Sequence, residues 1–123
     1  MDVIESRIVY IEDDPWGRTR AYHGMIVYDT APVDPRTEWD NPTQQEIDAY
    51  NNGRVYGFVV DFITEGFDDE TIDSCYGYYG DDEFPYMNAC IDEAIERHRN
   101  ALEQRRFIVG WLFDTVDFTR SLE

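Results

Sequence analysis

The sequence contains no lysine, and its ten basic residues, all arginine, stand against 27 aspartates and glutamates. The formal net charge is therefore −17. Nucleic acids and anionic membranes bind to positive surfaces, so this imbalance argues against direct binding to either. A charge of this size favours solubility and fast association with a basic partner, and it does not specify the fold.

Cysteines and long apolar runs are also scarce. Cys75 and Cys90 are too few for a disulfide scaffold, so each is expected to be a small buried hydrophobic residue in the reduced state. No run approaches the roughly 18 apolar residues of a membrane span. The first residues, Met1 to Glu5, have neither a basic leader nor the apolar core of a signal peptide. We therefore expect a cytoplasmic protein.

The chain is nevertheless rich in residues that build a core. Of its 123 residues, 42% are hydrophobic and 15% are aromatic. A disordered acidic tail would be poor in aromatic and β-branched residues. A chain of this length buries one sizeable core but not two. The sequence therefore predicts a single folded domain, residues 1–123.

Four β-rich segments are grouped as two hairpins. Val3–Ile11 and Arg20–Tyr28 flank the turn signal at residues 13–17. Arg54–Ile63 is almost continuously apolar and is expected to be the central strand, followed by Thr71–Tyr79. In this last strand, alternation predicts one face with Ile72, Ser74, Tyr76 and Tyr78, and the other with Asp73, Cys75 and Tyr79.

Two helices complete the pattern. Asn41 or Thr43 caps the start of a short helix, Thr43 and Glu46 fit a capping box, and Gly53 ends it. From Phe84 onward, apolar residues recur every three or four positions, which is typical of a long amphipathic helix. Gly110 is expected to break or kink this helix and to leave an apolar segment, residues 111–118.

These elements predict an α+β fold. We expect an antiparallel sheet of about four strands in two hairpins, with a short helix between them and the long C-terminal amphipathic helix on one face. The segment between the first hairpin and the short helix, residues 31–42, is expected to cross the surface with Trp39 packed inward.

No motif for catalysis or metal binding is complete. An EF-hand beginning at Asp69 would have Ser74 where the loop needs glycine and Gly80 where it needs glutamate. The cysteines and histidines lack zinc-site spacing, and no serine or cysteine nucleophile has its motif. We therefore expect a non-enzymatic protein without cofactor or metal. A pocket with three or more converging acids would instead favour an enzyme that uses a divalent metal.

One long segment is acidic throughout, because no basic residue occurs between Val55 and Glu96. Carboxylates on a strand or a helix are spaced about 5–7 Å apart, which is comparable to phosphate spacing in a nucleic acid. Such a surface could occupy a basic channel, although a merely solvated face is the alternative. The predicted partner-binding residues are Asp61, Glu65, Asp68, Asp69, Glu70, Asp73, Asp81, Asp82, Glu83, Asp92, Glu93 and Glu96.

With its size, its charge, this acidic segment and the sequence between Asp73 and Asp82, the chain resembles the small acidic counter-defence proteins of phages and plasmids. These are the anti-restriction and anti-CRISPR DNA mimics. The resemblance implies an inhibitor in the host cytoplasm that occupies the basic nucleic-acid-binding site of a host nuclease or CRISPR effector. The alternative is a protein interaction or regulatory module that uses the apolar segment 111–118, including as a homodimer, with charge serving solubility.

Overall fold

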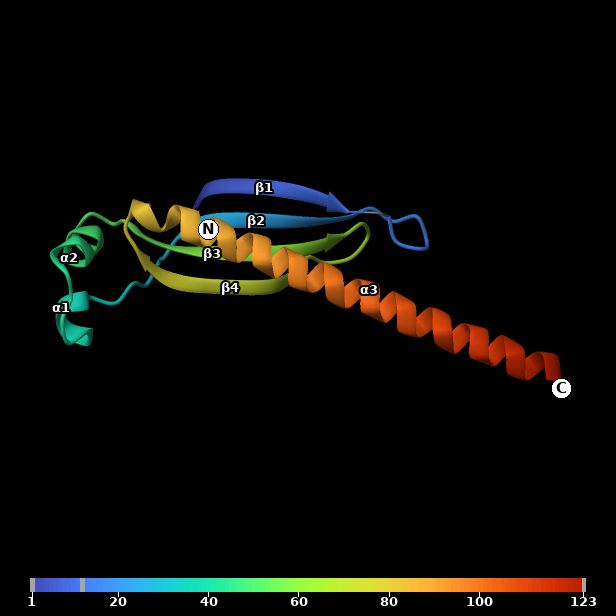
Figure 1. Cartoon of the computed structure of the whole chain (residues 1–123). Helices are drawn as coiled ribbons and strands as arrows, with labels where there is room; N and C mark the ends of the chain where they lie inside the picture. Colours follow the sequence, from blue (N-terminus) through green and yellow to red (C-terminus); the bar gives the residue numbers. More distant parts are fainter. Residues whose placement is uncertain (1, 12, 123) are drawn as a thin grey trace.

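The computed structural model describes residues 2–11 and 13–122, and describes side chains up to Arg105. The elements are β1 (Val3–Ile11), β2 (Arg20–Tyr28), α1 (Pro35–Glu38), α2 (Gln44–Asn51), β3 (Val55–Thr64), β4 (Glu70–Tyr79), the 3-10 helix η1 (Asp81–Glu83) and α3 (Phe84–Leu122). Helix α3 crosses one face of the sheet, and α1 and α2 lie beyond one of its ends (Figure 1). The predicted α+β fold is confirmed.

All strands of the sheet are antiparallel and follow the order β1-β2-β3-β4. The two predicted hairpins are therefore joined by pairing between β2 and β3, which become the internal strands. Both internal strands are largely buried. This burial explains why β3 reads as continuously apolar rather than alternating. The edge strands β1 and β4 are more exposed and more polar.

The main core lies between α3 and the sheet. It joins Met87, Ile91, Ala94 and Ile95 of α3 to Tyr22, Ile26, Tyr56, Phe58 and Val60 of the internal strands. The helical members recur at three- and four-residue intervals and so share one face of α3. Gly24 brings the two layers close, because a Cβ at this position would lie 2.5 Å from Cγ2 of Ile91.

A second cluster packs on the opposite face of the sheet, at the end next to α2. It contains Ala49 of α2, Val55 and Tyr79, with Trp39 packed against them. Trp39 is thus packed inward as predicted. The predicted capping box is also confirmed, because the Thr43 side chain accepts from the Glu46 amide and the Glu46 carboxylate accepts from the Thr43 amide.

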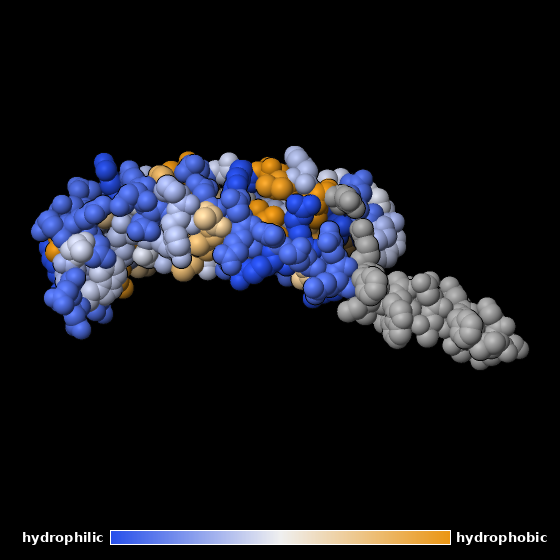
Figure 2. All heavy atoms as spheres, viewed as in Figure 1, coloured by the Kyte–Doolittle hydropathy of each residue, from blue (hydrophilic) through white to orange (hydrophobic). Residues whose placement is uncertain are grey.

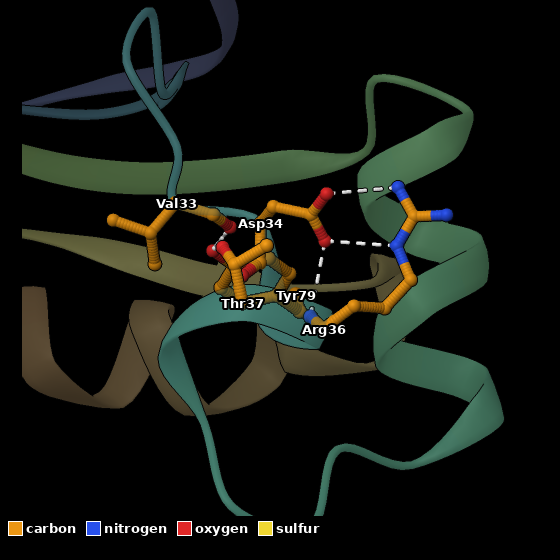
Figure 3. Close-up of polar contacts among 5 residues, drawn as sticks. All are labelled: Val33, Asp34, Arg36, Thr37 and Tyr79. Atoms are coloured by element: carbon orange, nitrogen blue, oxygen red, sulfur yellow. Dashed lines mark hydrogen bonds and ion pairs between the residues drawn. The ribbon is translucent and has the colours of Figure 1, made fainter.

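The single-turn helix α1 was not predicted. Its N-cap is Asp34, whose carboxylate accepts hydrogen bonds from the amide and the guanidinium of Arg36 (Figure 3). The Tyr79 hydroxyl donates to the carbonyl of Val33 at 2.5 Å and holds this segment against the sheet. One short capped turn gives too few apolar repeats for a periodic signal.

The face assignment of β4 was partly wrong. Ser74 and Tyr76 lie opposite Val59 and Gly57, as one face requires, but Tyr78 lies opposite Tyr56 and turns toward α3. Gly77, at φ 89°, is the extra residue at this shift in register. A bulge of this kind reverses the alternation, and simple period-two counting does not detect it. At a second shift in register, Ile72 is itself the extra residue, and it packs against the core on the α3 side.

The expected break at Gly110 is also wrong, because α3 continues through this residue to Leu122. The apolar segment 111–118 lies outside the residues whose side chains are described. Within the described part of the chain, no helix has the length and apolar character needed to cross a membrane.

The close approach at Gly24 predicts an overpacking effect. Gly24→Ala should lower the free energy of unfolding by about 1–3 kcal/mol in urea denaturation, since Cγ2 of Ile91 occupies the position of the added methyl group. In an Ile91→Ala background, where space is open, the same change should cost much less. An equal cost in both backgrounds would show that Ile91 is not the obstacle.

Candidate binding site: an acidic tip with two exposed aromatic rings

The twelve predicted acids do not share one surface. Glu65, Asp68, Asp69 and Glu70 lie in or beside the connection between β3 and β4, whereas η1 carries its three acids at the opposite end of β4. A ten-residue strand such as β4 is about 33 Å long. The remaining five lie on β3, β4 and α3.

Several of these acids have structural partners from elsewhere in the chain. Arg7 pairs with Asp92 at 2.6 Å, Arg54 with Asp81 at 3.8 Å and Arg97 with Asp73 at 3.4 Å. The segment that lacks basic residues in sequence is therefore not free of them in space. Asp61 accepts from the Thr71 hydroxyl at 2.7 Å on the face opposite α3, and Asp82 accepts from Gln45 at 2.9 Å.

At η1 the acids support the fold. The Tyr56 hydroxyl donates a short hydrogen bond to Asp81. Burial and this hydrogen bond raise the pKa of Tyr56 to about 12, so the phenol keeps its proton. These contacts fix η1 to the sheet.

The opposite end of the sheet is different. The β1–β2 and β3–β4 connections lie at this same end (Figure 1). They are joined by two hydrogen bonds, from the Thr19 amide to the Glu65 carboxylate at 3.1 Å and from the Glu65 amide to the Thr19 carbonyl at 2.9 Å. We call residues 13–19 and 64–70 the acidic tip.

Asp14 organises the first half of the acidic tip. Among the described residues it is the one buried charged residue, with 9% of its surface exposed. Its carboxylate accepts from the amide of Trp16 at 2.9 Å and from the amide and Nε of Arg18, each at 2.8 Å. Burial acts to raise the pKa of Asp14, but these hydrogen bonds and the Arg18 charge lower it below its ordinary value. The turn is thus held by an ionised carboxylate.

Arg18 links two aromatic rings across the acidic tip. Its guanidinium carbon lies 5.2 Å from the ring centroid of Trp16 and 4.6 Å from that of Phe67. These are cation–π distances. The two rings remain 77% and 60% exposed. Large exposed aromatic residues held in a fixed position are typical of the anchors of protein interfaces.

The two connections that carry these rings are rich in carboxylates. Six of them belong to the acidic tip, against Arg18 as its one arginine: Asp13, Asp14, Glu65, Asp68, Asp69 and Glu70. All except Asp14 are exposed. Four of the six are among the predicted binding residues. Trp16 lies in the predicted turn and Phe67 lies between two predicted strands, so neither was a predicted binding residue. An aromatic residue in each of two Asp-rich turns was a signal that could have identified the pair.

The α3 side of the molecule is mostly hydrophilic, with small hydrophobic areas (Figure 2). A groove between β1 and α3 has Val9 and Ile95 in its lining, together with Asp92, Glu96 and Glu103. Although three carboxylates line this groove, the described residues contain no group of three or more that could hold a metal ion.

The remaining reactive side chains have identifiable environments. Cys75 and Cys90 are free thiols, but Cys75 is exposed, so its predicted burial is wrong. His98 is half-buried, and its Nδ1 is hydrogen-bonded to the Tyr22 hydroxyl at 2.7 Å. Burial lowers the pKa of His98, and the ring packs against Tyr22 and Phe62. This histidine belongs to the edge of the core.

The chain matches no protein-family model, and no curated protein or solved structure is significantly similar to it.

The lowered pKa of Asp14 predicts how the acidic tip responds to acid. Asp14 stabilises the folded state only while ionised, so its contribution is present above the unfolded pKa and is lost as pH falls through the lower folded value. In NMR titrations, the amide protons of Trp16 and Arg18 should shift together with a midpoint below 3.8. Asp14→Asn should abolish this shift. A midpoint at or above 3.8 would mean that the carboxylate does not receive these hydrogen bonds in solution.

Proposed function

We propose that this protein is an inhibitor that binds the basic nucleic-acid site of a partner protein through the acidic tip. The partner class is the one implied by the resemblance, a host nuclease or a CRISPR effector in the host cytoplasm. The protein acts in this proposal by binding alone, without catalysis or a cofactor. It does not bind nucleic acid itself, because its field repels phosphates.

One observation carries this proposal: the acidic tip combines five exposed carboxylates with two exposed aromatic rings. Proteins that bind single-stranded nucleic acid combine a positive groove for phosphates with surfaces on which bases stack. The acidic tip offers the complement of both features. Its carboxylates correspond to phosphates, and the flat faces of Trp16 and Phe67 correspond to bases.

The structure of the acidic tip also supports binding energetically. Asp14 and the Thr19–Glu65 hydrogen bonds already hold both connections in place. A preorganised surface loses less conformational entropy on binding than a mobile one. The other acids of the chain contribute to the long-range field of a −17 protein, which speeds encounter with a basic site.

Of the twelve acids predicted to bind the partner, only those of the acidic tip are proposed to contact it. In this proposal Glu65, Asp68, Asp69 and Glu70 contact the partner, together with Asp13. The acids of η1, and those paired with arginines, act through the field or through the fold.

Two variants with equal charge change test this division. The tip variant carries Asp13→Asn, Asp68→Asn and Asp69→Asn, and the α3 variant carries Glu93→Gln, Glu96→Gln and Glu103→Gln, all at exposed positions. Purified nucleases and CRISPR effectors serve as immobilised probes, with and without excess DNA. We expect capture that DNA competes away, a loss of affinity of at least about tenfold for the tip variant, and less than about threefold for the α3 variant.

Equal losses for both variants would show that total charge matters and the acidic tip does not. Capture that ignores DNA and both variants would place the interface elsewhere, with the apolar segment 111–118 as the next region to test.

The aromatic anchors are tested separately from the charges. Trp16→Ala should weaken capture by about 2 kcal/mol, or roughly 30-fold, because it removes a large exposed anchor. The salt dependence of binding should stay unchanged, since no charge is altered. Tyr86→Ala, at a ring 58% exposed on α3, is the control and should have little effect. If the two variants bind alike, Trp16 does not lie in the interface.

A further inference from the structure

On the face of the sheet opposite α3, the exposed residues belong to the edge strands β1 and β4, and those of β2 and β3 are buried or half-buried. Strand register places fifteen residues on this face beyond the α2 end: Val3, Ser6, Ile8, Tyr10, Ala21, His23, Met25, Val27, Gly57, Val59, Asp61, Ile63, Thr71, Ser74 and Tyr76. Helix α2 and the adjoining Trp39 pack against the end at Val55 and Tyr79. Figure 1 shows α3 on the other side of the sheet. We call these fifteen residues the open face.

The open face is mostly apolar, and its polar members are Ser6, His23, Asp61, Thr71 and Ser74. Met25 and Val59 form a small buried cluster with Val27 in the floor of the sheet. Ile8 and Tyr10 are 51% and 71% exposed along the β1 edge. Tyr76 comes from the β4 edge, and its ring lies 2.3 Å from where a Cβ of Gly57 would be, so it lies over that glycine. Exposed apolar residues thus lie at both edges of a floor of buried apolar residues.

Acidic residues are nearly absent from the open face. Of the 27 in the chain, Asp61 alone lies among the fifteen positions. Its carboxylate accepts from Thr71, and its cross-strand neighbour is His23. Depletion of charge from a continuous apolar patch distinguishes the centre of a protein interface from ordinary surface.

We infer that the open face binds the same face of a second copy, forming a two-fold symmetric dimer by packing sheet on sheet. Two copies of a −17 chain repel each other, so they can approach closely only where charge is absent. In a two-fold contact one surface patch meets itself, and therefore a neutral, apolar patch is compatible with its own copy. Sheets packed in this way lie about 10 Å apart, which leaves the acids at the rims.

The size of the open face sets the expected strength. Four strands about 4.8 Å apart and about seven residues long give a projected area of roughly 450 Å². Because side chains make this surface uneven, its accessible area is somewhat larger than the projected area. It is therefore comparable to the smallest specific interfaces, which bury about 600 Å² per partner. We therefore expect a weak dimer that forms only at high protein concentration.

Salt distinguishes this dimer from the proposed complex with a basic partner. Screening weakens the repulsion between two like-charged copies, so dimerisation should strengthen as salt rises. Binding of the acidic tip to a basic site should instead weaken. Because the two surfaces contain different residues, either inference can fail while the other holds.

Sedimentation velocity of the full chain tests the dimer over about 5–500 µM protein, at about 50 and 500 mM NaCl. We expect a concentration-dependent dimer whose Kd falls several-fold at the higher salt. Ile8→Glu should raise the Kd at least tenfold. Val33→Glu, at a residue 46% exposed on the linker to α1, carries the same added charge and should leave the Kd within about twofold.

Circular dichroism reports whether each variant folds. If Ile8→Glu does not fold, the milder Tyr10→Ser takes its place in the test. Tyr10 is the most exposed ring of the open face, and this change should raise the Kd several-fold. A protein that stays monomeric at all concentrations and both salts would overturn the inference. So would a dimer that neither open-face variant weakens, because it would use a different surface.

Discussion

The packing of α3 against β2 and β3 is the contact on which the rest of the structure depends. It provides the largest buried cluster, with Met87 and Ile91 set against Tyr22 and Ile26. A net charge of −17 opposes a compact state, so this apolar burial must offset repulsion as well as chain entropy. The core consequently excludes acids. Most of the described acids lie in the connections at the ends of the sheet, on the exposed sides of α3 and on the edge strands, and Asp61 of β3 is the exception within the sheet.

This confinement makes the two ends of the sheet different. At the η1 end, Asp81 and Asp82 are bound to Tyr56 and Gln45 and help to close the fold. At the acidic tip, Asp14 has the structural role, and its neighbours remain exposed. Because Asp14 accepts the hydrogen bonds that hold the β1–β2 connection, the other carboxylates of the acidic tip remain exposed to a partner. The same sorting leaves the open face nearly free of charge.

Much of the fold could be predicted because its signals are local. The bounds of β1 and β2 follow from β-rich runs on either side of an Asp-Pro-Trp-Gly turn, and the start of α2 follows from the Thr43–Glu46 capping box. The bulge at Gly77 was missed because glycine is also common in regular turns and strand ends, and only pairing with β3 shows that one residue is extra. Helix α1 depends on one cap and on contacts with Tyr79.

The candidate site was less accessible from the sequence. Acidic composition identified four residues of the acidic tip but also eight others, because one-dimensional charge does not show that Arg7, Arg54 and Arg97 come from distant segments to pair with three of them. The link from Trp16 through Arg18 to Phe67 arises only when β2 and β3 pair and bring two turns together. Such a site is defined by sheet register, which the sequence specifies only through the complete fold.

Hydrogen–deuterium exchange of the protein with and without a captured effector tests the central claim most directly. The account predicts slower exchange in the peptides that cover residues 13–19 and 64–70, and recovery of free-state exchange when excess DNA displaces the protein. Protection confined to other regions, such as η1 or the apolar segment 111–118, would contradict it, because the partner would then bind without the acidic tip.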